Sequence, residues 1–253
     1  MTDQQTVGWV GPSGQMAEDP SAFQRTLDEY GRILVQSGAM RVAADLRGRF
    51  RLRNGAYSWV YLDHGDLLCQ PETNSVLTKV LVSYIRAKFD PQHTVLANVD
   101  SKSSPQLTGA IASIGSYRQV VVLPEVTYRR ERGMRLRLRL PAQLTERDSI
   151  VIVDDVLTPS DTTGLQVAKL VRRHVAERVG GKPRSVEVHL VVGVARDPSI
   201  ACPPLRRNGI RVHWLKTLDE IISGAWPDLA VSQRERLRLE FPAAPTAGSE
   251  LIR

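Results

Sequence analysis

Two adjacent carboxylates, Asp154 and Asp155, follow an apolar run near the middle of the chain. The run, Val151-Ile152-Val153, is rich in β-branched residues, and a Ser/Thr/Asp cluster comes after the acids. Such a run is typical of a parallel strand buried on both faces, and ligands of open α/β sheets bind outside the carboxyl ends of these strands. The pattern predicts a site for a polyhydroxylated, phosphorylated ligand with a divalent metal. The plainer interpretation is a solvated strand end at which one acid caps a turn.

The elements that must position these acids alternate between helix and strand. Helical spacing of apolar residues is found at 22–37, 74–89, 107–114 and 165–179. Strand patterns are found at 94–99, 119–123, 149–153, 185–195 and 210–215. A β-rich stretch at 48–63 contains Asn54-Gly55, a strong hairpin signal. This alternation predicts an α/β fold with a parallel sheet that helices cover on both faces.

Composition sets wider bounds. A chain of 253 residues is long enough for one domain with extensions, which we place at 21–236, between a disordered segment at 1–20 and a tail at 237–253. The net charge of +7 favours anionic partners, and the abundance of arginine suits bidentate contacts with phosphate or carboxylate. The codon usage of a GC-rich genome is an equally simple explanation of the arginine content.

Cysteine usage and hydropathy indicate the compartment. The two cysteines, Cys69 and Cys202, form neither a metal-spacing motif nor a disulfide framework. No run of about 20 apolar residues is present, and the first residues lack the apolar core of a signal peptide. We therefore expect a cytoplasmic protein without a membrane segment.

Three colinear segments resemble the type I phosphoribosyltransferases and, within them, the orotate phosphoribosyltransferases. The first is Val151 to Thr163, which has the family's apolar strand, acid pair and phosphate loop. The second is Gly48 to Ser58, followed by Tyr61 and Asp63. The third is Ser101-Lys102-Ser103-Ser104-Pro105, which stands where the family has its pyrophosphate loop. The resemblance covers roughly residues 23–223 and implies a parallel sheet flanked by helices, with a small hood subdomain built from the early hairpin and the later strands.

The resemblance also implies a donor and a metal. The donor is phosphoribosyl pyrophosphate, whose ribose hydroxyls Asp154 and Asp155 would hold directly or through Mg²⁺ and water. Lys102 and Ser103 would bind the pyrophosphate. The 5-phosphate loop would comprise Thr158, Ser160, Asp161, Thr162 and Thr163. Catalysis would consist mostly of stabilising the departing pyrophosphate by metal and cationic groups.

The segment at the position of the family's mobile lid is rich in arginine. Arg129, Arg130 and Arg132 stand where the family has Arg, Lys and His. Arginine can stabilise pyrophosphate, but its pKa above 12 prevents it from acting as a general acid near neutral pH. The strict alternation at 134–140 predicts a strand with an arginine face, the Arg135-Arg137-Arg139 stripe. This stripe either meets another anion or is a solvated edge whose charges oppose aggregation.

The phosphate loop departs from the family pattern. Pro159 removes one N–H donor, and a lost hydrogen bond to phosphate would cost about 1.5–3 kcal/mol. Asp161 adds a negative charge unless it caps the helix that follows. Thr162-Thr163-Gly164 is an alternative frame for the loop after a short insertion. The sequence is compatible with either frame.

Two arginines are candidates for the base. Arg53 stands where the family has a base-contacting Lys, and Arg196 stands at the Arg that contacts orotate. Ala195 replaces the Asp of that family pair. The two guanidinium groups could hold a carboxylate or carbonyl of a planar base. The alternative for Arg196 is an ordinary surface arginine at a strand end.

The function we expect is phosphoribosyl transfer to orotate or a related base, by a protein that forms a homodimer as family members often do. The altered loop and lid leave two rivals. One is a non-catalytic regulator that binds phosphoribosyl pyrophosphate, a nucleotide or nucleic acid. The other is an enzyme for an unusual base or for reverse pyrophosphorolysis. Nucleic acid is not the favoured partner, because no DNA-reading module is recognisable.

Overall fold

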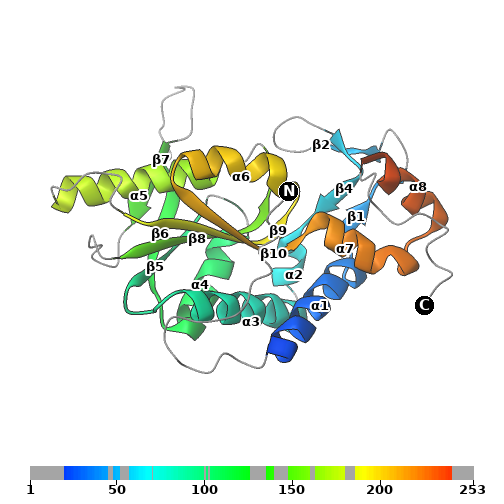
Figure 1. The fold of residues 1–253 in the computed structure, drawn as a ribbon, viewed down its shortest axis with the longest axis horizontal. Helices are drawn as coiled ribbons and strands as arrows, with labels where there is room; N and C mark the ends of the chain where they lie inside the picture. The colour runs from blue at the N-terminus through cyan, green and yellow to red at the C-terminus, as the bar shows by residue number, and fades with distance from the viewer. Residues whose placement is uncertain are drawn as a thin grey trace, which may run out of the picture.

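A computed structural model gives the fold of the chain. It describes residues 20–44, 48–51, 57–69, 71–99, 101, 103–125, 135–139, 148–159, 163–179 and 186–240. A central sheet lies at one end of the molecule and a smaller subdomain at the other (Figure 1).

The central sheet has the strand order β10-β9-β8-β5-β6-β7. Its strands are β5 (Thr94–Asn98), β6 (Arg118–Glu125), β7 (Arg135–Arg139), β8 (Ser149–Leu157), β9 (Val188–Ala195) and β10 (Ile210–Thr217). Strands β10, β9, β8, β5 and β6 are parallel, and β7 pairs antiparallel with β6 at the edge. The strand predicted from the alternating arginines is thus present, and it pairs along its whole length.

Helices cover both faces of the sheet (Figure 1). One face carries α1 (Pro20–Gln36), α3 (Pro71–Lys88) and α4 (Ser104–Gly115), and the other carries α5 (Thr163–Val179) and α6 (Pro198–Arg207). Each face has its own hydrophobic core. Val151 and Val153 belong to the first core, and Ile150 and Ile152 belong to the second. Because both faces of β8 are buried, its sequence is continuously apolar, as predicted.

Strand β8 continues past the acid pair, so the prediction that it stops at Val153 is wrong. The register with β9 pairs Asp154 with Val192 and Val156 with Val194. The eight residues of β9 are all buried, and the pairing of β9 with β8 continues to Leu157. The two acids therefore lie inside the strand, with successive side chains on opposite faces.

The hood is built from short strands and late helices. Strand β1 (Met40–Val42) pairs antiparallel with β4 (Val60–Leu62), and β2 (Phe50–Arg51) pairs antiparallel with β3 (Tyr57–Ser58). The expectation that the later strands join the hood is wrong, because β9 pairs with β8 and β10 pairs with β9 in the central sheet. Instead the hood is completed by α8 (Val231–Glu240), whose Arg236 donates to the Ala43 carbonyl over 2.8 Å.

The remaining helices differ in how clearly the sequence marks them. Helix α2 (His64–Leu68) is short, and α6 contains Pro203 and Pro204, which normally argue against a helix interior. Helix α7 (Leu218–Ala225) begins with a capping box between Thr217 and Glu220 and leads into the 3₁₀ turn η2 (Trp226–Asp228). The predicted domain boundary after residue 236 falls inside α8, where Leu237 is buried, so the fold extends at least to Glu240.

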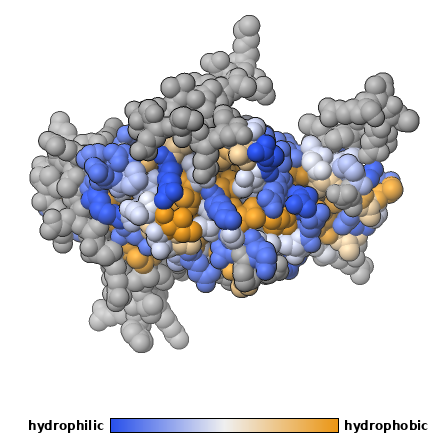
Figure 2. All heavy atoms as spheres, turned by 90° about the horizontal axis from the view of Figure 1, so that it is seen from below, coloured by the Kyte–Doolittle hydropathy of each residue, from blue (hydrophilic) through white to orange (hydrophobic). Residues whose placement is uncertain are grey.

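The surface seen from the side of α1 and α3 is mixed. Hydrophilic and hydrophobic residues are interspersed over its coloured part (Figure 2). Among the helices of the described ranges, none has both the length and the apolar character that crossing a membrane requires. Cys69 is exposed, Cys202 is buried, and both are free thiols.

A cluster of histidines and aromatic rings lies between α3 and the β9–β10 edge. His189 Nδ1 and His213 Nε2 are 3.0 Å apart, and the Tyr84 hydroxyl is 3.0 Å from His213 Nδ1. The ring of Phe89 packs edge-on against His189. Burial lowers the pKa of His213 to about 4, and the positive charges of His189, Lys88 and Arg211 contribute to the shift.

Acidification is expected to destabilise the fold through this cluster. Between pH 6.5 and about 4, unfolded His213 binds a proton that the folded form excludes, so the free energy of unfolding falls as the pH falls. The full contribution is about 3 kcal/mol. His213→Asn should therefore lose less stability than the wild type between pH 7 and pH 4.5 in urea unfolding. His93→Asn, at an exposed histidine, is the matched control and should follow the wild type. Equal losses in both variants would contradict the assignment.

Candidate functional site

The acid pair meets the serine-rich loop that follows the neighbouring strand. Ser103 Oγ donates to Asp155 Oδ2 over 2.5 Å, and Ser101 Oγ donates to Asp154 Oδ1 over 3.4 Å. The two segments come together because β5 and β8 are adjacent and parallel, so their carboxyl ends share one edge. The structure thus places Ser103 beside the acids.

Ser104 fixes this loop to the sheet. Its hydroxyl donates to the Val153 carbonyl over 2.5 Å and accepts from the Val99 N–H over 2.9 Å. Its own N–H donates to Ser101 Oγ over 3.1 Å. With Pro105 in the first turn, α4 begins here, and the expected polar loop at 101–106 ends earlier than predicted. The buried Ser104 therefore holds both serines next to the acids.

The backbone of β8 orients the carboxylates. The Asp155 N–H donates to Asp154 Oδ1 over 2.9 Å, and the Val156 N–H donates to Asp155 Oδ1 over 2.8 Å. Asp154 is buried at 5% exposure, whereas 19% of the Asp155 side chain is exposed. Asp155 is consequently the more accessible acid for a ligand.

Beneath Asp155 lies a buried pair that the sequence did not single out. The Tyr30 hydroxyl is 2.7 Å from His64 Nε2, and His64 Nδ1 is 3.8 Å from Asp155 Oδ2. Both Tyr30 and His64 are almost fully buried. Burial raises the pKa of Tyr30, so its hydroxyl is protonated and can donate to Nε2. The imidazole proton then lies on Nδ1, which faces Asp155 and has no hydrogen-bond partner among the described residues.

The protonation states follow from burial and neighbouring groups. Burial lowers the pKa of His64, and the Asp155 and Asp63 carboxylates oppose this only in part, so His64 is neutral near pH 7. For Asp155, burial acts to raise the pKa. The interaction with His64 and the hydrogen bond from Ser103 act in the opposite direction and outweigh burial, so the pKa of Asp155 lies below its usual range. Asp155 is therefore ionised at neutral pH and available to hydroxyl groups or a metal.

Gly193 on β9 leaves the space that this arrangement needs. A Cβ atom at this position would lie 2.5 Å from Tyr30 Oη and 3.1 Å from the Asp155 carbonyl oxygen. Gly193→Ala should therefore lower the free energy of unfolding by about 1–3 kcal/mol, as overpacking of a core does.

Two variants control this prediction, which urea unfolding measures. Gly109→Ala in α4 meets nothing within 4 Å and should not destabilise the protein. The cost of Gly193→Ala should be smaller in a Tyr30→Phe background, because the clashing hydroxyl is absent. A Gly193→Ala protein as stable as the wild type would contradict the packing argument.

The phosphate-loop residues lie only partly within the described ranges. Thr158 and Pro159 follow β8, and α5 begins at Thr163, with its N-terminus toward the carboxyl end of the sheet. The N–H groups of such a terminus are a general anion site. In the first turn, Gly164 packs closely, because an added Cβ would lie 3.3 Å from Leu190 Cδ2. Gly164 thus brings α5 near the sheet.

Arg196 is buried at the carboxyl end of β9 and is not an ordinary surface arginine. Its Nη2 donates to Ser58 Oγ, to the Val60 carbonyl over 2.9 Å and to Glu240 Oε1 over 3.2 Å. Glu240 in turn accepts from the Trp59 N–H over 2.7 Å. Arg196 therefore joins the central sheet to the hood. Its partner Glu240 lies 44 residues later in the sequence.

Comparison with known proteins finds similarity to orotate phosphoribosyltransferases. No protein-family model matches the chain. The chain is 29% identical over 149 residues to the orotate phosphoribosyltransferase of Sulfurovum sp. (strain NBC37-1), covering 54% of this chain and 70% of that protein. A match to the orotate phosphoribosyltransferase of Parvibaculum lavamentivorans, 29% identical over 152 residues, covers 57% of this chain and 74% of that protein. The crystal structure of orotate phosphoribosyltransferase from Aeropyrum pernix superposes with a TM-score of 0.56 at 26% identity, covering 76% of this chain and 95% of that one. The chain therefore has the fold of the type I phosphoribosyltransferases and is similar in sequence to the orotate phosphoribosyltransferases.

The type I phosphoribosyltransferase-like fold that the three sequence segments predict is thus confirmed. Several site residues predicted from the sequence lie outside the described ranges. These are Arg53, Lys102, Arg129, Arg130, Arg132, Ser160, Asp161 and Thr162. For the stripe Arg135-Arg137-Arg139, the backbone pairing of β7 with β6 is established. The roles of all these residues stay predictions.

The acid pair fits a magnesium ion that is shared with a substrate. Among the described residues, no group of three or more His, Cys, Asp or Glu side chains could hold a metal alone. Mg²⁺ keeps several waters and commonly uses one or two carboxylates together with substrate phosphates. Asp155, ionised and partly exposed beside the buried Asp154, offers oxygen ligands of this kind. A bound Mg²⁺ would supply positive charge next to pyrophosphate.

Sequence reasoning missed three site residues, Tyr30, His64 and Glu240. Tyr30 was assigned only to the apolar face of a helix. His64 directly follows the Tyr61–Asp63 segment and was the available signal, because histidine is seldom fully buried without a polar partner. Glu240 lay in the predicted tail and gave no signal. All three reach the site through long-range contacts.

Proposed function

We propose that the protein transfers a phosphoribosyl group from phosphoribosyl pyrophosphate to orotate or a related planar base, releasing pyrophosphate. It would act as a glycosyltransferase of the phosphoribosyltransferase type. The observation that carries the proposal is the pair of acids, Asp154 and Asp155, which accept hydrogen bonds from Ser101 and Ser103 respectively at the carboxyl ends of β5 and β8. The family relationship and the names of the curated relatives support it.

In this proposal the acid pair holds the ribose. The partly exposed Asp155 carboxylate accepts hydrogen bonds from the ribose hydroxyls, directly or through Mg²⁺-bound water. Its orientation is fixed before the substrate arrives, because Ser103 and the Val156 N–H already occupy defined positions on its oxygens. Positive charge that develops on the ribose in the transition state lies near this carboxylate. A preorganised charge of this kind requires little reorganisation during the reaction.

The two phosphate ends would be held on either side of the acids. Ser103 and Lys102 come from the loop after β5 and would bind pyrophosphate together with Arg129, Arg130 and Arg132. The 5-phosphate would lie at the N-terminus of α5, among Thr158, Ser160, Asp161, Thr162 and Thr163. The helix terminus supplies N–H donors, which compensates for the donor that Pro159 lacks.

The base would contact Arg53 and Arg196. All three hydrogen bonds from the Arg196 side chain to described residues use Nη2. A guanidinium carries five N–H donors, so its other groups can serve a carboxylate or carbonyl of a base. Orotate as the acceptor would make the reaction a step of pyrimidine nucleotide synthesis.

Calorimetric titration with phosphoribosyl pyrophosphate, with and without MgCl₂, tests the donor site. We expect binding that MgCl₂ strengthens. A panel of orotate, uracil, adenine and other bases, assayed for pyrophosphate release, then identifies the acceptor. No binding in the presence of MgCl₂ would overturn the proposal. Binding without turnover on any base would favour a regulator, and turnover only on another base would favour an altered enzyme.

We also propose a homodimer, as the family resemblance suggests. Sedimentation equilibrium measures it directly. A monomer at the concentrations used for the activity assay would overturn this part of the proposal without affecting the assignment of the donor site.

A further inference from the structure

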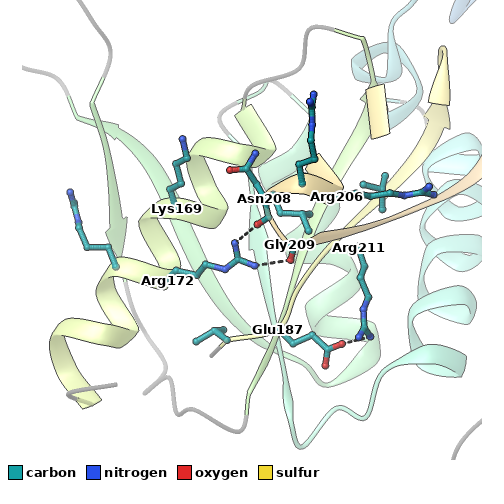
Figure 3. A pocket seen from close by; sticks show the side chains of 12 residues that line it. Lys169, Arg172, Glu187, Arg206, Asn208, Gly209 and Arg211 are labelled. Carbon is teal, nitrogen blue, oxygen red and sulfur yellow. Dashed lines mark hydrogen bonds and ion pairs between the residues drawn. The ribbon is translucent and has the colours of Figure 1, made fainter. Parts of the chain in front are cut away.

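A basic groove lies between α5 and α6 (Figure 3). Its volume is about 1010 Å³, and its walls come from α5, the end of α6, the two residues before β9 and the first residues of β10. Six cationic side chains line it: Lys169, Arg172, Arg173, Arg206, Arg207 and Arg211. Glu187 is the acidic residue of this lining.

Part of this positive charge has a structural role. Arg172 donates to the Asn208 carbonyl over 2.6 Å and to the Gly209 carbonyl over 2.7 Å, which ties α5 to the turn after α6. Arg211 forms an ion pair with Glu187 (Figure 3). Arg173 lies 3.6 Å from Glu177 in an exposed pair. These contacts provide partners for Glu187 and for three of the six cationic side chains, Arg172, Arg173 and Arg211.

Three cations are left over. Lys169, Arg206 and Arg207 are exposed, and their side chains make no hydrogen bond or ion pair with another residue in the described part of the chain. Arg206 and Arg207 lie in the last turn of α6, where a positive charge also interacts favourably with the helix dipole. That explanation does not extend to Lys169, which lies in the middle of α5. Three like charges around one groove repel each other unless an anion is bound between them.

The groove is separate from the proposed phosphoribosyl site. It lies at the amino ends of β9 and β10, whereas the acid pair lies toward the carboxyl end of β8. The length of β9 places these two edges about 25 Å apart. A ligand of this groove is therefore not the substrate of the acid pair.

The chemistry of the walls points to an extended phosphate ligand. No aromatic ring lines the groove, and its apolar residues Val186, Ile210 and Val212 are buried. A protein partner would need an exposed apolar anchor, and base recognition by stacking would need an aromatic ring. Arginine suits phosphate because its planar fork makes two parallel hydrogen bonds. The exposed cations line an open surface, which suits a chain of phosphates better than a compact metabolite.

We propose that this groove binds the phosphodiester backbone of nucleic acid without selecting bases. Lys169, Arg206 and Arg207 contact successive phosphates, and the net charge of +7 attracts the polyanion over longer distances. The proposal does not depend on phosphoribosyl transfer, and either can fail alone.

Fluorescence anisotropy with labelled oligonucleotides tests the proposal over a series of KCl concentrations. The test variant is Lys169→Gln/Arg206→Gln/Arg207→Gln. The matched control is Arg25→Gln/Arg32→Gln/Lys79→Gln, which removes the same charge from exposed positions on α1 and α3. We expect the test variant to bind single strands at least about tenfold more weakly at low salt, and the logarithmic salt slope to decrease by about 2. The control should keep most of the affinity, and DNA and RNA of different sequences should bind alike.

Four outcomes would overturn the proposal. They are no binding by the wild type, equal losses in both triple variants, a strong preference for one sequence, and competition by nucleoside triphosphate but not by unlabelled oligonucleotide. Pyrophosphate release by the test variant should equal that of the wild type, because none of its substitutions lies at the phosphoribosyl site. That assay separates failure of the groove from failure of the proposed enzyme activity.

Discussion

Asp155→Asn is expected to lower kcat/KM for phosphoribosyl transfer by about 10²–10⁴-fold, because two charge-assisted hydrogen bonds to the ribose contribute about 1.5–3 kcal/mol each. The substitution keeps the shape of the side chain and removes its charge. The carbonyl oxygen of the new amide can still accept from Ser103, so the circular dichroism spectrum of the variant should match that of the wild type. Measurements at saturating base, with and without MgCl₂, give kcat and KM for the donor separately.

Asp148→Asn is the matched control for this change. Asp148 is buried at the amino end of β8 and pairs with Arg118, so the same substitution is made on the same strand about 23 Å from Asp155. It should reduce stability, because it weakens a buried ion pair, and leave kcat/KM close to the wild-type value. Wild-type kcat/KM in Asp155→Asn would remove the acid pair from the mechanism, and an equal loss of activity in both variants would indicate a general structural effect.

Glu240→Gln is expected to lower the free energy of unfolding by about 3 kcal/mol, because it leaves the Arg196 guanidinium buried without its counter-charge. Arg196 exposes only 7% of its side chain, and burial lowers its pKa while Glu240 opposes that shift. Glu240 is 25% exposed, which places the expected loss at the lower end of the range for buried pairs. The melting temperature should fall by roughly 6–12 °C for a domain of this size.

Two further variants make this prediction specific. Glu235→Gln lies on the same helix at an exposed position and should change stability by less than about 0.5 kcal/mol. The double variant Arg196→Met/Glu240→Leu removes both charges together and should recover much of the lost stability. If Arg196 also contacts the base, the double variant stays inactive although it is stable. Glu240→Gln as stable as Glu235→Gln would show that the pair contributes nothing.

The sequence predicted the central sheet well because its signals are local. Continuous apolar runs marked β5, β8 and β9, and helical spacing marked α1, α3 and α5. These patterns follow from burial on both faces of a parallel sheet and on one face of each helix. Helix α6 was missed because Pro203 and Pro204 are strong local signals against a helix, which the surrounding packing overrides. Helix α8 was missed because the charged residues along it resemble a solvated tail.

The candidate site divides in the same way. The acid pair was singled out from its place after an apolar strand and Ser103 from the family resemblance, and the pairing of β5 with β8 in the structure places them side by side. The extension of β8 through both acids was not, because it depends on the register with β9. Tyr30 and His64 reach Asp155 only after α1 and α2 pack under the sheet, and Gly193 matters only because Tyr30 lies against it.

By itself, the sequence determined the α/β fold, the resemblance to a family and the acid pair, since each depends on residue types at short spacing. Only the tertiary structure decided the partners of these residues. Arg196 and Glu240 are 44 residues apart, and the basic groove combines α5 with residues that lie near position 209. Contacts of this kind leave no periodic signal, because the residues that form them are separated by whole helices and strands. Their effect on charge and burial is set by which surfaces the sheet brings together.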